Sequence, residues 1–114
     1  MTLGEKQRLF VKLSAKFDLW CYEQGYELTD GEAYRTPEQA ALNAANGSGI
    51  SNSLHTKRLA RDKNLFIAGV YQTTSEAHRP LGEYWKSLDP LCRWGGDFRK
   101  PDGNHYSMEF QGIQ

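Results

Sequence analysis

The first stretch of the chain carries hydrophobic residues at helical spacing. Apolar side chains recur every three or four residues, and lysines and glutamates occupy the positions between them. Gly25 follows, and glycine is a typical residue at the end of a helix. The pattern predicts an amphipathic helix over residues 1–25 with a core-facing stripe formed by Leu9, Phe10, Leu13, Phe17 and Trp20.

A second helix is predicted from the residues at its start. Thr36 stands at the N-cap position, Pro37 at the first helical position, and Gln39 completes a capping box. Alanine-rich sequence continues to Asn46, and Gly47 ends the segment. The helix start fixes the backbone just after Arg35, where a side chain can be held firmly.

The remaining segments are short and mix strand and helix patterns without a regular strand–helix–strand repeat. A polar, Gly/Ser-rich loop covers 47–52. The patterns predict extended segments over 26–35, 58–66, 70–71, 93–98 and 105–110, and a helix over 75–88. This mixture predicts an α+β fold, a small antiparallel sheet with helices packed on it.

Composition narrows the class of protein. The 114 residues suffice for one domain, residues 1–114, with one core. Lys and Arg number 14, as do Asp and Glu, so the net charge is zero and a nucleic-acid partner is disfavoured. No apolar run approaches the ~20 residues of a membrane span, and the N-terminus lacks signal-peptide features. Cys21 and Cys92 are expected to be plain thiols, although one disulfide stays open.

Three residues form a candidate metal site. His55, Asp62 and His105 supply two imidazoles and one carboxylate, which leave a tetrahedral zinc ion one open position for water. Asp102 precedes the last histidine by three residues and is a candidate proton acceptor. Arg35 is a candidate for stabilising an oxyanion or binding a substrate carboxylate. By spacing alone, surface or capping roles explain these residues better than a zinc site does.

Four motifs, taken in order, resemble one family. Residues 53–62 read Ser-Leu-His-Thr-Lys-Arg-Leu-Ala-Arg-Asp and resemble the Ser-x-His-x-x-Gly-x-Ala-x-Asp signature of the D-alanyl-D-alanine carboxypeptidase (VanY-like) family of zinc peptidases. Residues 34–39 are similar to its Arg-Thr-x-x-x-Gln segment, and 102–105 to its Asp-x-x-His terminus. Residues 93–98, Arg-Trp-Gly-Gly-Asp-Phe, resemble the strand of the phage L-alanyl-D-glutamate endopeptidases in that family.

The resemblance implies roles for the candidate residues. His55, Asp62 and His105 match the ligands of one zinc ion, and Asp102 matches the catalytic carboxylate. Arg35 matches the arginine that stabilises the transition state or orients the substrate. The resemblance also implies a hedgehog-like fold with a catalytic core over 26–110.

Further matches and departures concern the surroundings of the site. By resemblance, Ser53 lies near the substrate carboxylate or carbonyl, and Gln39 supports the site. Arg58 stands where the signature has glycine, and we expect it in a strand with its side chain facing out. The family's closing His-x-Glu is absent, so Glu109 is expected to replace that glutamate beside the last histidine. Asp97 rivals Asp102 as the catalytic carboxylate, with a structural acceptor role as the alternative.

The implied activity is zinc-dependent hydrolysis of an amide bond in peptidoglycan stem peptides. The phage-like motifs favour an endolysin that cleaves the L-alanyl-D-glutamate bond and stays in the cytoplasm of the host bacterium until release. A D-alanyl-D-alanine carboxypeptidase, or a non-catalytic zinc-fold binding or virion protein, are the alternatives. The sequence leaves the scissile bond, the host and the oligomeric state open.

Overall fold

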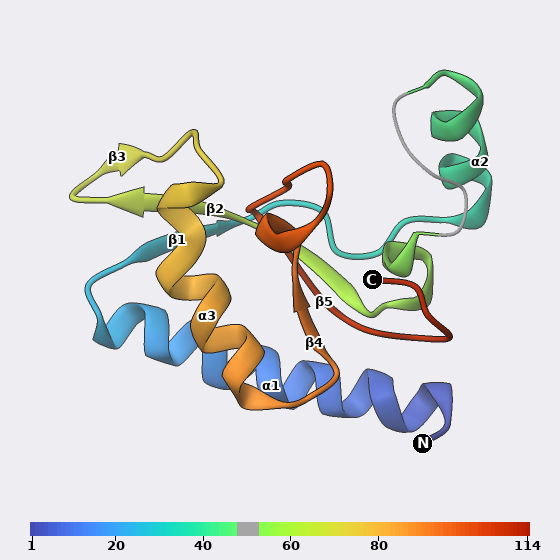
Figure 1. Ribbon diagram of the computed structural model, residues 1–114, viewed down its shortest axis with the longest axis horizontal. Helices are drawn as coiled ribbons and strands as arrows, with labels where there is room; N and C mark the ends of the chain where they lie inside the picture. Colours follow the sequence, from blue (N-terminus) through green and yellow to red (C-terminus); the bar gives the residue numbers. More distant parts are fainter. Residues whose placement is uncertain (48–52) are drawn as a thin grey trace.

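A computed structural model describes residues 1–47 and 53–114 and confirms the predicted α+β class (Figure 1). The predicted loop over 47–52 lies, beyond Gly47, outside the described residues. The sheet is antiparallel with the order β1-β2-β5-β4, and β3 pairs with the far end of β2. The α-helices are α1 (Leu3–Glu23), α2 (Pro37–Ala45) and α3 (Arg79–Leu88). The strands are β1 (Glu27–Asp30), β2 (Ala60–Ile67), β3 (Val70–Tyr71), β4 (Cys92–Trp94) and β5 (His105–Met108), and the 3-10 helices are η1 (Leu54–Lys57), η2 (Glu76–His78) and η3 (Gly95–Asp97).

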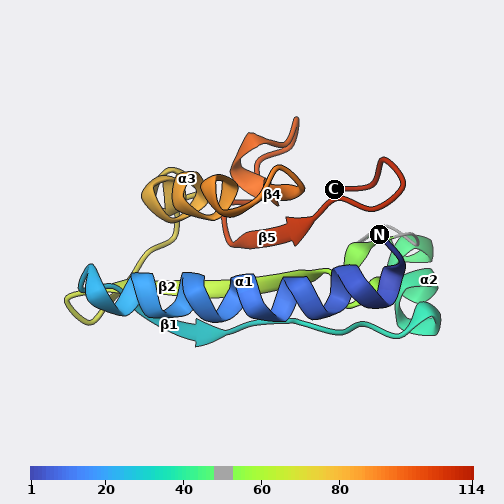
Figure 2. The same ribbon diagram turned by 90° about the horizontal axis from the view of Figure 1, so that it is seen from below.

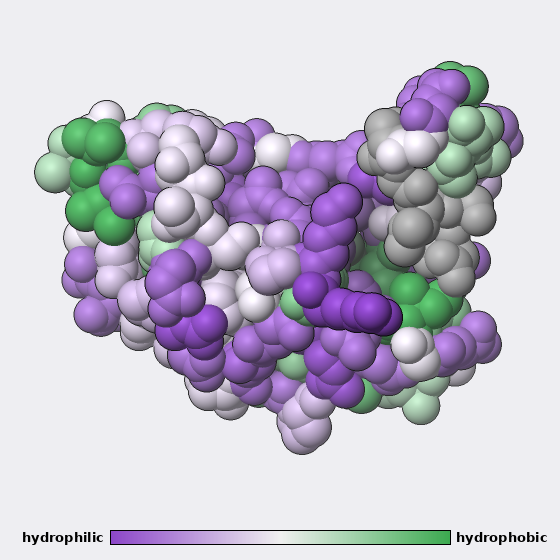
Figure 3. All heavy atoms as spheres, turned by 45° about the horizontal axis from the view of Figure 1, so that its top comes forward, coloured by the Kyte–Doolittle hydropathy of each residue, from purple (hydrophilic) through white to green (hydrophobic). Residues whose placement is uncertain are grey.

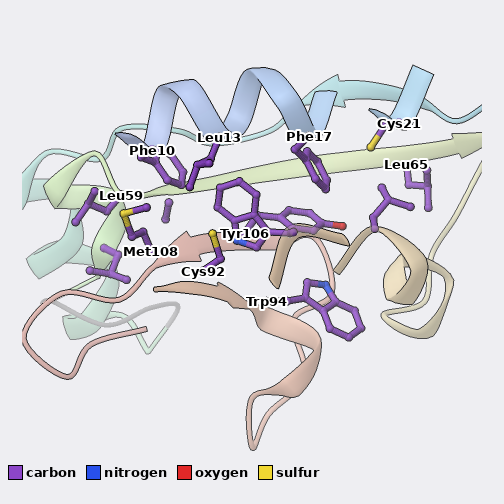
Figure 4. Close-up of a cluster of buried hydrophobic side chains, with 14 residues drawn as sticks. Phe10, Leu13, Phe17, Cys21, Leu59, Leu65, Cys92, Trp94, Tyr106 and Met108 are labelled. Atoms are coloured by element: carbon purple, nitrogen blue, oxygen red, sulfur yellow. The ribbon is translucent and has the colours of Figure 1, made fainter. Parts of the chain in front are cut away.

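Helix α1 runs along the sheet and supplies much of the core (Figure 2). Its predicted apolar stripe faces inward, with Phe10 and Phe17 at most 3% exposed. Both rings pack edge-on against Trp85 of α3, with ring centroids 5.6 and 5.8 Å apart. Phe17 also packs against Tyr106 of β5 (Figure 4), with 4.8 Å between the ring centroids. One core therefore joins α1, α3 and β5, the strand that begins at His105.

Helix α2 begins as predicted, with Thr36 as its N-cap and Pro37 in its first turn. The Thr36 hydroxyl accepts a hydrogen bond from the Gln39 backbone N–H at 3.0 Å. The Gln39 carboxamide, however, donates to Asn43 at 2.6 Å, so the predicted capping box is only half formed. In Figure 1, α2 stands at the end of the molecule opposite the β2–β3 hairpin.

Strand β2 begins at Ala60, two residues later than predicted, because Arg58 is not in the sheet. Arg58 ends η1 in the left-handed conformation, with φ of 56°. The expectation of an outward-facing strand residue was therefore wrong, and the left-handed φ accounts for the glycine at this position of the signature. The Arg58 guanidinium stacks on the ring of Tyr34 with 4.0 Å to the centroid, which offsets part of the backbone strain.

Other predicted elements are also shorter than expected, among them the strands predicted over 26–35 and 105–110. The predicted helix over 75–88 is divided into η2 and α3, because Pro80 in the first turn of α3 lacks a backbone donor. The predicted strand over 93–98 ends at Trp94, where the chain turns into η3. A Cβ on Gly95 would lie 1.9 Å from the Asp102 carbonyl oxygen, so the turn depends on glycine.

Trp94 is a buried core residue, and it also fixes the turn that precedes β5. Its ring lies between Gly82 of α3 and Gly96, where a Cβ on either glycine would overlap the indole. The indole N–H donates to the Gly103 carbonyl at 2.7 Å. The sheet, α3 and the 101–104 turn are therefore locked together beside His105.

Both cysteines are buried free thiols, which agrees with the expectation from their number. Burial raises the pKa of each thiol, Cys21 and Cys92, to about 12, so neither is a reactive thiolate at neutral pH. Among the residues described, there is also no helix with the length and hydrophobicity that a membrane crossing demands.

Candidate metal centre

The register between β2 and β5 places two of the predicted metal ligands side by side. Asp62 lies directly opposite His105 in this antiparallel pair. Directly opposite residues point to the same face of a sheet with their Cβ atoms close together. The two side chains therefore meet although 42 residues separate them, with His105 Nδ1 lying 3.5 Å from Asp62 Oδ1.

The third predicted ligand comes from η1, which leads into β2. Ser53 caps this 3-10 helix, and its hydroxyl accepts from the His55 backbone N–H at 3.2 Å. The cap directs His55 inward, where Nε2 lies 3.3 Å from Asp62 Oδ1. The potential ligand atoms of His55, Asp62 and His105 all lie within 4.8 Å of one another, and the two histidines are at most 7% exposed.

The hydrogen bonds of the two imidazoles show that this cluster suits a cation. His55 Nδ1 lies 2.7 Å from the Ala33 carbonyl, and His105 Nε2 lies 3.3 Å from the Gln114 carbonyl. A carbonyl accepts, so each of these nitrogens carries the proton, and in a neutral ring the other nitrogen presents its lone pair to Asp62. Asp62 Oδ1 is itself buried and has no hydrogen-bond partner among the described residues. Three electron-pair donors thus converge with no donor hydrogen between them, which is the arrangement that a zinc ion requires.

The pKa values of the clustered side chains also depend on their contacts with one another. Burial opposes ionisation of Asp62, but the imidazoles of His105 and His55, when they are protonated, donate to the carboxylate and lower its pKa to about 2. Burial likewise opposes protonation of His55, yet the contacts with Asp62 and the Ala33 carbonyl raise its pKa. The Asp62 carboxylate therefore stays ionised at neutral pH, and its negative charge favours a metal cation in place of the imidazole protons.

The segment before α2 shapes the site through its backbone, and no pattern of side chains in the sequence indicated this role. Gly31 N–H donates to the Asp62 carbonyl at 2.9 Å, and the Glu32 carbonyl accepts from Asp62 N–H at 2.8 Å. The next carbonyl, of Ala33, is the one that orients His55. Residues 31–33 thus extend the sheet beyond β1 and hold two of the three predicted ligands.

Arg35 lies on the wall of the cavity beside the cluster and is oriented by Glu32. Its Nε donates to Glu32 at 3.0 Å, and its Nη2 contacts the same carboxylate oxygen. The backbone N–H of Arg35 donates to the His55 carbonyl at 3.2 Å. The Glu32 carboxylate also lies 3.9 Å from His55 Nδ1, so it links the arginine to the first ligand.

A single cavity of about 780 Å³ brings most of the predicted site residues together. Asp102 lies on its wall, and the cavity walls partly desolvate the carboxyl and raise its pKa, with the Asp62 charge adding to the effect. Figure 3 shows the surface hollowed between the end that carries α2 and the opposite end. The predicted residues on its wall are Arg35, Ser53, His55, Asp62, Asp97, Asp102 and His105.

Gln39 is the predicted site residue that the structure does not bring to this cavity. Its side chain is exposed on α2 and bonded to Asn43, so its supporting role stays a prediction. Ser53 is present on the wall, where its hydroxyl serves as the η1 cap, and contact with a substrate stays a prediction. Asp97 is exposed and paired with Lys86 at 2.7 Å, an acceptor role that the sequence left open.

Glu109 does not replace the missing glutamate beside the last histidine, so that expectation was wrong. Its carboxylate accepts from Gly112 N–H at 2.5 Å and lies 3.9 Å from Lys6. The partner of His105 is instead the Gln114 carbonyl, brought back by the Phe110–Ile113 bridge. Nothing in side-chain spacing could have indicated a backbone acceptor.

Comparisons with known proteins identify a solved structure with this fold. No protein-family model matches the sequence, and no curated protein matches it either. The crystal structure of the Serratia marcescens L-Ala D-Glu endopeptidase ChiX superposes with a TM-score of 0.61. The superposition covers 90% of this chain and 77% of that chain, at 19% sequence identity. This similarity establishes a shared fold.

Proposed function

We propose that the protein is a zinc-dependent peptidoglycan peptidase that hydrolyses the L-alanyl-D-glutamate bond of stem peptides. The convergence of lone pairs from His55, Asp62 and His105 on the wall of a large cavity carries this proposal. The four motifs and the fold shared with an L-Ala D-Glu endopeptidase support the same reaction.

In the proposed reaction, the metal ion and two side chains of the protein have separate roles. A bound zinc ion would supply a Lewis acid that polarises the scissile carbonyl and activates the attacking water. Asp102 takes the proton of that water and passes it to the departing amine, a role that suits a carboxyl whose pKa is raised. Arg35, held by Glu32, directs its remaining N–H groups at the developing negative charge.

The cavity rim also suits the part of a stem peptide that carries carboxylates. Arg99 and Lys100 line the cavity and are exposed, and Arg35 lies on the same wall. D-glutamate bears a free carboxylate next to the scissile amide, so these cations favour the D-glutamate side of the substrate. We place the protein among the phage-type lytic enzymes, acting on the host wall after release from the host cytoplasm.

Digestion of purified murein by the zinc-loaded protein tests the proposal. Mass spectrometry of the products should reveal new N-terminal D-glutamate, and His55→Ala should produce none. Release of D-alanine instead would identify a carboxypeptidase. Intact murein after incubation with protein that holds one zinc ion would overturn the enzyme assignment and leave a binding protein of the same fold.

A further inference from the structure

A second, smaller cavity lies next to the metal site, across the turn that carries Asp102. Its volume is about 190 Å³, and both cavities share the residues Pro101 and Asp102 in their walls. Its other walls come from the segment after β3 and from the end of the same turn, residues 71–75 and 103–104, together with His78. A substrate that lies across Asp102 therefore reaches both cavities.

The lining of the second cavity is polar but, apart from Asp102 at its border, uncharged. Thr73, which is exposed, and Asn104 line the cavity, and their side chains form no hydrogen bond within the described parts of the chain. His78 is only 4% exposed, and its Nδ1 lies 2.7 Å from the Tyr106 hydroxyl. In either neutral tautomer, Nε2 then leaves one hydrogen-bonding position for a ligand. Burial lowers the pKa of His78 to about 4, which keeps the ring uncharged.

The two cavities thus differ in the chemistry that they accept. The metal-site cavity has the cations Arg35, Arg99 and Lys100 in its wall, whereas the second cavity offers hydroxyl, amide and imidazole groups. Carboxylates of a stem peptide fit the first kind of wall. A group with hydroxyls and an acetamide, but little charge, fits the second.

Resting on the proposed endopeptidase reaction, we propose that the second cavity binds the N-acetylated sugar to which the stem peptide is attached. In peptidoglycan the sugar is joined through a lactyl group to the L-alanine, so it lies one amino acid from the scissile carbonyl. A cavity that shares Asp102 with the metal site is within that reach. A bond near the far end of the stem would lie several residues from the sugar, so this subsite belongs to cleavage after L-alanine.

Paired substrates test the subsite. Both carry the same L-alanyl-D-glutamyl peptide, one on N-acetylmuramic acid and the other on an acetyl cap. We expect the wild type to show a KM at least ~10-fold lower for the sugar-bearing substrate. The acetyl-capped substrate lacks the one or two hydrogen bonds to the sugar that account for this difference. Thr73→Val should reduce this preference and Thr73→Trp, which fills the cavity, should abolish it, with the acetyl-capped substrate unaffected. Thr29→Val, on the exposed face of β1, is the matched control.

Binding without turnover separates the subsite from the reaction. Addition of N-acetylmuramyl-L-alanyl-D-glutamate to the Asp102→Asn variant should shift the backbone amide resonances of residues 72–75, and the acetyl-capped peptide should not. Equal KM values for the two substrates, or a sugar preference that survives Thr73→Trp, would overturn the subsite while leaving the peptidase assignment intact. If neither substrate is cleaved, the amide shifts alone decide, and unshifted resonances reject the subsite.

Discussion

At the scale of single residues, neighbouring groups set the protonation state, the tautomer or the orientation of each site side chain. Asp62 is kept ionised by two imidazoles, and those imidazoles are kept in one tautomer by backbone carbonyls. Glu32 orients Arg35. Among the described residues Asp102 forms no ion pair with a lysine or arginine, which leaves its carboxylate available for proton transfer. Each of these arrangements gives a testable consequence.

Replacing Asp102 should separate metal binding from catalysis. Asp102→Asn keeps the shape of the side chain but cannot accept a proton, so kcat should fall by ~10²–10⁴-fold. The bound zinc, measured by elemental analysis, should remain one ion per chain, because the three clustered ligand atoms do not include Asp102. Asp97→Asn is the control, since Asp97 shares the cavity wall but is paired with Lys86. Loss of zinc from Asp102→Asn would make Asp102 a ligand instead.

Glu32 is a positioning residue, so its loss should weaken catalysis through Arg35. Glu32→Gln removes the charge that holds the guanidinium, and we expect kcat/KM to drop ~10-fold, with most of the loss in kcat. Glu32→Asp should recover part of the activity because it restores the carboxylate. Glu38→Gln, an exposed change on α2, should have no effect. If Glu32→Gln has the same kcat as the wild type, Arg35 does not need the Glu32 carboxylate for its role in catalysis.

Because His78 is buried, the protein should lose stability as the pH decreases. Its pKa is about 4 in the fold, lowered by burial from 6.5. Above pH 6.5 the His78 side chain is neutral in both the folded and the unfolded protein. Between pH 6.5 and 4, His78 binds a proton in the unfolded chain but not in the folded chain. The free energy of unfolding should therefore decrease by about 3 kcal/mol across this window. Urea titrations of the metal-free protein at pH 7 and pH 4 measure it, and His78→Gln should lack this part of the decrease; an equal decrease in both proteins would contradict the assignment.

At the scale of elements, the site depends on close approaches between segments. The η3 turn lies against the Asp102–His105 turn, with Asp102 N–H donating to the Gly95 carbonyl at 2.9 Å. Trp94 fixes the same turn from the other side through its bond to Gly103. The Arg-Trp-Gly-Gly-Asp-Phe motif is therefore built chiefly to place Asp102 and His105.

A side chain at Gly95 should disturb the fold and the site together. In Gly95→Ala the new Cβ would meet the Asp102 carbonyl oxygen and, at 2.8 Å, the Cβ of His105. We expect a loss of about 1–3 kcal/mol in stability, together with weaker zinc binding. Thermal unfolding and zinc titration measure the two effects. Gly4→Ala in α1, where the nearest atom is 3.6 Å away, should be neutral or slightly stabilising. Wild-type zinc affinity in Gly95→Ala would show that the turn tolerates the displacement.

At the scale of the whole molecule, the proposed metal would link side chains from three segments that already meet in one core. Its ligands come from η1, β2 and β5. Around them, the core formed by α1, α3 and the sheet holds β5, and β2 links β5 to β1. Metal binding should therefore stabilise the fold as well as supply chemistry.

Zinc removal should lower the melting temperature. At a free zinc concentration ~1,000 times the dissociation constant, binding adds about 4 kcal/mol of stability, or roughly 10 °C or more for a domain of this size. Scanning calorimetry with zinc and with a chelator measures the shift. His55→Ala should show little of it, because one ligand is lost. An identical melting temperature for the wild type in both conditions would contradict a zinc site.

The sequence by itself determined the local secondary structure and the types of side chain available for a metal site. The spacing of apolar residues fixed α1, and Thr36 with Pro37 fixed the start of α2, because these signals act within one turn of helix. Side-chain types identified His55, Asp62 and His105 as candidate ligands. The resemblance anticipated which of these residues would lie together.

Only the tertiary structure decided how these residues are held. The β2–β5 register, the left-handed Arg58, the role of Glu32 and the carbonyls of Ala33 and Gln114 all arise from contacts between distant segments. Backbone carbonyls are the same in every residue, so no pattern of side chains reveals which of them will accept from an imidazole. Folding selects them, and with them the tautomers that turn two histidines and an aspartate into a candidate metal centre.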